Sequence, residues 1–169
     1  MAVASPTATP ANTNIIYPVL VPLDERNADS NLFGASGSNG LIASSNGNDR
    51  VYTLASFDID KTKTQCTLKF VITENPGQPG PGLFGDNLRF DVWAYQDFDS
   101  KTVTWNNQGP RGDYYGRIYV IRNAESSQIH FQCASSSISL LLMPVDNDVI
   151  GWVEQVQPLV GLIMTQAQE

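Results

Sequence analysis

Residues Cys66-Thr67-Leu68-Lys69-Phe70-Val71-Ile72 decide the fold class of this chain. The even positions of this stretch are apolar, and among the odd positions only Val71 breaks the polar alternation. A period of two residues is typical of a β-strand that turns one face toward a core. The stretch therefore predicts a half-buried strand that carries Cys66 on its buried face.

A second alternating stretch runs from Gln128 to Cys133, with Ile129, Phe131 and Cys133 on its apolar face. Cys66 and Cys133 are the only cysteines, and both are predicted to point into the core. We expect them to form a buried disulfide, which is typical of an oxidising compartment. Two buried free thiols in a reducing compartment are the alternative, because free cysteine is itself often buried.

Strand-like runs fill the remainder of the chain, and no run of ten or more residues carries a helical apolar stripe. The predicted strands are Ile15–Leu20, Arg50–Ile59, Gln65–Thr73, Asn87–Tyr95, Lys101–Trp105, Gly116–Ile121, Gln128–Ala134, Ser137–Val145 and Pro158–Thr165. Turn residues separate them, among others at Ser38–Gly40 and Asn46–Asp49. We expect an all-β fold, an antiparallel β-sandwich or jelly roll of about nine or ten strands. A single domain at 14–165 would follow a disordered tail rich in Ser, Thr and Pro at 1–13.

The composition excludes two classes of partner. Charged residues are 16% of the 169 residues, the net charge is −7, and Ser, Thr, Asn and Gln number 48. An acidic chain lacks the basic patches that nucleic-acid binding and anionic membranes require. No apolar run is long enough to span a bilayer. We therefore expect no nucleic-acid partner and no membrane span.

Candidate catalytic groups are few. His130, the only histidine, lies between two glutamines on the polar face of its predicted strand. Neither a Gly-x-Ser-x-Gly motif nor a twelve-residue calcium loop is present. We predict no catalytic residue, no metal and no cofactor, and a calcium ion at the oxygen-rich turns Asn46–Asp49 and Asp146–Asp148 is the alternative. A glycan hydrolase or lyase stays open as an alternative, with its acid pair drawn from Asp58, Asp60, Asp91, Asp97 and Asp99.

The predicted strand Asn87–Tyr95 carries the candidate binding residues. Its outward positions are Arg89, Asp91, Trp93 and Tyr95. Aromatic rings beside neutral and acidic groups suit a sugar or a protein partner. Tyr114 and Tyr115 follow a loop rich in Pro and Gly and are added to this candidate set. The alternative is that Trp93 and Tyr95 are covered, by the 13-residue loop Glu74–Asp86 or by an N-terminal strand.

The most distinctive stretch is Lys101-Thr-Val-Thr-Trp-Asn-Asn-Gln108, in which Trp105 is predicted to plug the end of the sandwich. With Phe57-Asp58-Ile59, Cys66-x-Leu-x-Phe70, Cys133 and Pro158–Ile163, it makes the chain resemble the fungal But2 C-terminal domain family. The resemblance covers about Tyr17 to Met164. The family is named for a protein that binds Uba-three, and the resemblance brings no catalytic residues. Thr104–Gln108 is also similar to bacterial extracellular jelly-roll modules associated with polysaccharide binding.

The resemblance implies a secreted or cell-wall-associated fungal β-sandwich. Together with the residues above, it leads us to expect a non-enzymatic cell-surface or cell-wall protein. This protein would bind a cell-wall polysaccharide or a partner protein through an aromatic, amide-rich face. A glycan-active hydrolase or lyase and a dedicated protein-interaction module are the two alternatives.

Overall fold

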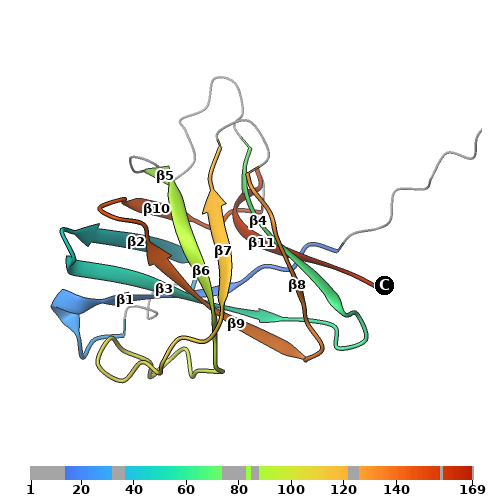
Figure 1. Cartoon of the computed structure of the whole chain (residues 1–169), viewed down its shortest axis with the longest axis horizontal. Coiled ribbons are helices and arrows are strands. Elements are labelled where there is room, and N and C mark those ends of the chain that lie inside the picture. Colours follow the sequence, from blue (N-terminus) through green and yellow to red (C-terminus); the bar gives the residue numbers. More distant parts are fainter. Residues whose placement is uncertain are drawn as a thin grey trace, which may run out of the picture.

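The computed structural model describes residues 14–31, 37–73, 83–84, 88–121, 126–156 and 158–168. Antiparallel strands dominate these residues and form two sheets, which confirms the predicted fold class. Figure 1 shows β4, β8 and β11 together on one side of the molecule, beside the strands of the larger sheet. The only described helix is the short 3-10 turn η1 (Glu25–Asn27).

The larger sheet has the order β5-β10-β2-β3-β9-β6-β7, with β1 paired to β3. Its strands are β1 (Val19–Asp24), β2 (Asn39–Ser45), β3 (Asn48–Asp58), β5 (Leu83–Phe84), β6 (Arg89–Tyr95), β7 (Tyr114–Tyr119), β9 (Ser137–Pro144) and β10 (Ile150–Val153). The smaller sheet has the order β11-β4-β8, with β4 (Gln65–Ile72), β8 (Ile129–Gln132) and β11 (Val160–Ala167).

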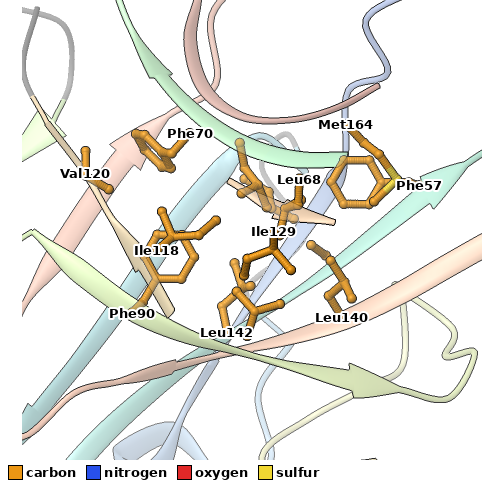
Figure 2. Packing of buried hydrophobic residues seen from close by; sticks show 14 of the residues in the cluster. Phe57, Leu68, Phe70, Phe90, Ile118, Val120, Ile129, Leu140, Leu142 and Met164 are labelled. Atoms are coloured by element: carbon orange, nitrogen blue, oxygen red, sulfur yellow. The ribbon is translucent and has the colours of Figure 1, made fainter. Parts of the chain in front are cut away.

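The main core lies between the two sheets. The alternation in β4 has the predicted outcome, since Cys66, Leu68, Phe70 and Ile72 are all buried there. Figure 2 shows Phe70 and Leu68 facing residues of the larger sheet, such as Phe90 and Leu142. Cys66 and Cys133 form the expected disulfide at the edge of this core.

A second apolar cluster covers the outer face of the larger sheet. Strands β1, β3 and β9 supply Val21, Leu23, Tyr52, Leu54 and Leu141. The segment between β6 and β7, residues 96–113, supplies Val103, with Phe98 and Trp105 packed against the cluster. The outer face of the larger sheet is therefore covered where this cluster lies, and Trp93 and Tyr95 of β6 pack against the cluster.

One predicted strand, Lys101–Trp105, is wrong. The segment forms turns, in which the Asp99 carboxylate accepts a hydrogen bond from the Lys101 amide at 2.9 Å. The Asp99 carbonyl accepts from the Val103 amide at 3.0 Å. The Thr-Val-Thr-Trp pattern is typical of a strand, but the acidic residue before it satisfies the backbone locally and closes a turn instead.

Three described strands were not predicted, β2, β5 and β10, and glycine and turn residues conceal β2 and β10. Gly40 lies inside β2, where Ser38–Gly40 is typical of a turn. A Cβ atom on Gly40 would clash with the Trp152 ring, so the residue must be glycine for β10 to pair with β2. Close approach of a ring, and not a turn, is the reason for this glycine.

The first strand lies further along the chain than the predicted Ile15–Leu20. β1 continues through Pro22 to Asp24. The Leu20 amide donates to the carbonyl of Gly37, on the side of β1 away from β3. The nitrogen of Pro22, two residues later, faces the same side, so proline costs no hydrogen bond with β3. Residues 1–13, the predicted tail, lie outside the described residues.

Candidate binding surface

Strand β6 presents its odd-numbered residues outward, as predicted. Phe90 and Val92 are fully buried in the main core, so Arg89, Asp91, Trp93 and Tyr95 lie on the opposite face. The structure separates these four residues into three local environments. Asp91 and Trp93 lie in the middle, Arg89 lies toward the start of the strand, and Tyr95 ends it.

Trp93 lies between the second apolar cluster and two outer side chains. Its ring centroid is 4.8 Å from the ring of Tyr114, and the two planes are tilted by 51°. The guanidinium carbon of Arg111 lies 4.2 Å from the centroid of Trp93. Trp93 is half-buried and packs against the second apolar cluster. The Trp93 ring is therefore the surface on which the Tyr114 ring and the Arg111 guanidinium pack.

Asp91 connects two residues of β7. Its carboxylate accepts hydrogen bonds from Arg117 at 2.8 and 3.2 Å and from the Tyr114 hydroxyl at 2.9 Å. The hydrogen bond to Asp91 raises the pKa of the Arg117 guanidinium above its usual range. Desolvation and the Asp91 carboxylate raise the pKa of Tyr114. We call Asp91, Trp93, Arg111, Tyr114 and Arg117 the β6–β7 face.

A β-bulge in β7 places Tyr114 and Arg117 on the same face. Trp93 is opposite Tyr114 and Asp91 is opposite Arg117, so three residue steps on β7 match two steps on β6. Gly116 takes a φ of 142°, which β-carbon-bearing residues rarely adopt. The extra residue turns Arg117 to the same side as Tyr114.

Tyr115, a predicted binding residue, faces away from the β6–β7 face. Its ring stacks on Phe131 of β8 with centroids 4.8 Å apart, and it packs against the main core. Neighbouring residues of a strand point to opposite faces, so Tyr114 and Tyr115 cannot contribute to one surface.

Arg89 and Tyr95 flank the β6–β7 face. The Nε of Arg89 donates to the Asp148 carboxylate, and an Nη lies 3.4 Å from Asp146. The Tyr95 hydroxyl accepts from the Gly109 amide at 2.6 Å, and its ring meets Phe98 edge-on. Burial raises the pKa of Tyr95.

An open depression of about 280 Å³ lies at the end of β6. Its lining is mostly polar and comes from Tyr95, Gln96, Asp97, Phe98, Asp99, Thr102, Val103, Asn107 and Gly109. Two of the acidic residues considered for glycan hydrolysis, Asp97 and Asp99, belong to this lining.

Trp105 lies on the outer face of the larger sheet and does not plug the end of the sandwich. Its ring packs 4.7 Å from Tyr52 and lies 5.2 Å from the Arg50 guanidinium. The side-chain amide of Asn107 satisfies two backbone groups of the same segment. Asn107 accepts from the Thr104 amide at 2.7 Å and donates to the Thr102 carbonyl at 3.0 Å.

Trp93 and Tyr95 are half-buried, because they pack against the second apolar cluster. The N-terminal strand β1 contributes to this cluster, as the alternative interpretation predicts, and so does the segment 96–113, which that interpretation did not include. Of the loop Glu74–Asp86, only Leu83–Phe84 is among the described residues, and these two residues pair with β10. Whether that loop acts as a lid therefore lies outside the described residues.

Three residues of the β6–β7 face, Asp91, Trp93 and Tyr114, are among the candidates predicted from the sequence, whereas Arg111 and Arg117 are not. The available signal for Arg117 was Gly116, which is typical of a bulge inside an otherwise regular strand. The sequence around Arg111 does not indicate its contact with Trp93, because this contact depends on the path of the whole segment 96–113.

Other chemistry is sparse in the part of the chain that the structure describes. His130 is exposed, with its Nδ1 2.9 Å from the Thr67 hydroxyl. The described residues contain no group of three or more His, Cys, Asp or Glu side chains placed to hold a metal ion. They also contain no helix long and apolar enough to cross a membrane.

Comparison with known proteins gives one family. The model of the family described as "Ubiquitin 3 binding protein But2 C-terminal domain" matches residues 17–158. The matched range includes β1 to β10 and every residue of the β6–β7 face. No curated protein matches the chain.

Proposed function

The chain belongs to the But2 C-terminal domain family, and on this premise we propose that it is a non-catalytic protein-binding domain that uses the β6–β7 face. The family description names a binding protein. The observation that carries the proposal is the composition of the face, where an exposed tyrosine and an arginine lie on one tryptophan. Trp, Tyr and Arg are the residues most enriched among those that dominate binding energy at protein interfaces.

The face is also held in place before a partner arrives. Tyr114 is 49% exposed, yet its ring rests on Trp93 and its hydroxyl donates to Asp91. Arg117 is fixed by two hydrogen bonds to the same carboxylate. Side chains that are ordered in the free protein lose less entropy on binding, so the face is suited to a specific contact.

The same proposal places the domain in an oxidising compartment, at the cell surface or in the cell wall. Support comes from the Cys66–Cys133 disulfide, since such bonds persist mainly in secreted proteins. Support also comes from the resemblance to secreted fungal proteins. The assignment to an oxidising compartment is tested by denaturing the protein from its natural source without reductant and then labelling it with a thiol reagent. Two labelled cysteines per chain would contradict this assignment.

Glycan binding at the depression beside Tyr95 is the second candidate. Its lining combines an aromatic ring with neutral and acidic side chains, as at Tyr95, Asn107 and Asp97. A polysaccharide binding screen that also monitors product release tests it. Glycan binding that is lost in Asp97→Asn and kept in Tyr114→Ala would favour glycan binding at this depression. Release of product would favour a glycan hydrolase or lyase.

Protein binding is tested by panning a library of random peptides against the wild-type domain. We expect enriched peptides whose affinity falls about tenfold or more in Tyr114→Ala, because the removed ring is a central exposed contact. Tyr17→Ala is the matched control, since Tyr17 is an exposed tyrosine that precedes β1. Equal affinities for the wild type and Tyr114→Ala would contradict the proposal.

A further inference from the structure

Arg111 differs from the other arginines among the described residues. Arg26, Arg50, Arg89 and Arg117 each form an ion pair with an aspartate or a glutamate. Arg111 is exposed, and none of the described carboxylates lies within ion-pair distance of it. Its charge is therefore not balanced by a direct partner within the described part of the chain.

The Arg111 guanidinium is nevertheless held in one position. It lies over the ring of Trp93 at 4.2 Å, and one Nη donates to the sulfur of Met143 at 3.3 Å. A cation over the face of a tryptophan is attracted by the ring quadrupole. Stacking occupies one face of the guanidinium and leaves its edge, with most of its five N–H donors, available to an acceptor.

The backbone on both sides of Arg111 is fixed to β6. The Gly109 amide donates to the Tyr95 hydroxyl, and the Gly112 amide donates to the Ala94 carbonyl at 2.8 Å. The Asp113 carbonyl accepts from the Ala94 amide at 2.8 Å. Arg111 is therefore presented by an anchored segment, which reduces the entropy lost when its side chain binds a ligand.

We propose that Arg111 binds the carboxylate of an aspartate or glutamate side chain of the partner protein. This proposal rests on the proposed function, and it identifies the chemistry that the β6–β7 face selects. The planar guanidinium fork matches a carboxylate with two parallel hydrogen bonds. The partner residue beside the acid would then lie on the exposed ring of Tyr114, which shares Trp93 with Arg111.

The surrounding charges favour a carboxylate over a phosphate. Asp113 is two residues along the chain, and the whole chain carries a net charge of −7. The charge of Arg117 is already paired with Asp91. Among the residues of the β6–β7 face, all of which the structure describes, Arg111 is the one cation without an ion pair. One carboxylate matches the charge of one guanidinium, whereas a dianion would keep an unbalanced negative charge.

The test uses one peptide from the panned library that depends on Tyr114. Its affinity is measured for the wild type, Arg111→Lys and Arg111→Gln, and for Arg26→Lys as the matched control. Lysine keeps the charge but loses the fork and the planar stack. We expect affinity to fall about 10- to 100-fold in both Arg111 variants, as for a lost charged hydrogen bond, and to stay unchanged in the control. Unchanged melting temperatures establish that the variants fold.

The same peptide is then made with its acidic residue replaced by the matching amide. We expect this peptide to bind the wild type as weakly as the acidic peptide binds Arg111→Gln, with no further loss when the two changes are combined. The contrary result is a peptide that depends on Tyr114 and yet keeps its affinity when Arg111 or its own acidic residue is replaced. This result would overturn the inference and leave the proposed function standing. Absence of any Tyr114-dependent peptide would overturn both.

Discussion

At the scale of single residues, the carboxyl group of Glu154 has an unusual pKa. One carboxylate oxygen accepts from the Trp152 indole at 2.9 Å and from the Leu162 amide at 2.6 Å, so it links β10 to β11 across the two sheets. The other oxygen is buried and has no hydrogen-bond partner. Burial raises the pKa of Glu154 to about 7. A buried carboxyl group of this kind favours the protonated state.

Glu154 makes stability depend on pH. Its pKa is higher in the folded chain than in the unfolded chain. Its contribution to the free energy of unfolding is therefore complete below pH 4.5 and is lost as the pH rises through about 7. The loss amounts to about 3 kcal/mol. We expect the melting temperature to fall between pH 5 and pH 8, and to fall much less in Glu154→Gln.

Glu25→Gln is the control for this experiment. A hydrogen bond from Arg50 lowers the pKa of Glu25 to about 2, so this residue is ionised throughout the same range. Its replacement should leave the pH dependence unchanged. An identical pH dependence of melting in the wild type and in Glu154→Gln would show that Glu154 titrates as an ordinary surface carboxyl group.

At the scale of elements, the segment 96–113 determines how the outer face of β6 behaves. Trp93 contributes to the second apolar cluster and also supports Tyr114. We expect Trp93→Ala to reduce the free energy of unfolding by about 2 kcal/mol or more, because contacts in that cluster are lost. Tyr114→Ala should cost less than about 1 kcal/mol, since nearly half of the side chain is exposed.

Denaturant unfolding of the two variants measures this difference. If Trp93→Ala is as stable as the wild type, Trp93 is not part of a packed cluster, and Tyr114 and Arg111 lose the support that the proposal requires.

How much the sequence predicts depends on where each element finds its contacts. The sequence predicted β4, β6 and β8 because one face of each strand is buried. Burial on one face makes apolar and polar residues alternate along the strand. β2 was missed because Gly40 is required by its contact with the Trp152 ring, and Trp152 is more than a hundred residues away. The same limit applies to the site, since Arg111 meets Trp93 only through the folded segment 96–113.

At the scale of the whole molecule, the Cys66–Cys133 disulfide closes a long loop that includes β4, β6, β7 and β8. The sequence separation of 67 residues corresponds to about 4 kcal/mol in the chain-entropy model. We expect the double variant Cys66→Ala and Cys133→Ala to lose about 2–5 kcal/mol of unfolding free energy.

Urea unfolding with and without reductant measures this loss. Reductant should lower the midpoint of the wild type and leave the double variant unchanged. Equal midpoints for the wild type in both conditions would show that the bond contributes nothing to stability.

The central claim is that the β6–β7 face binds a protein partner. The most direct measurement is the dissociation constant of one panned peptide for the wild type, Tyr114→Ala and Tyr17→Ala under identical conditions. The account predicts a loss of about tenfold or more in Tyr114→Ala and no loss in Tyr17→Ala. Equal dissociation constants for the wild type and Tyr114→Ala, with both proteins folded, would contradict it.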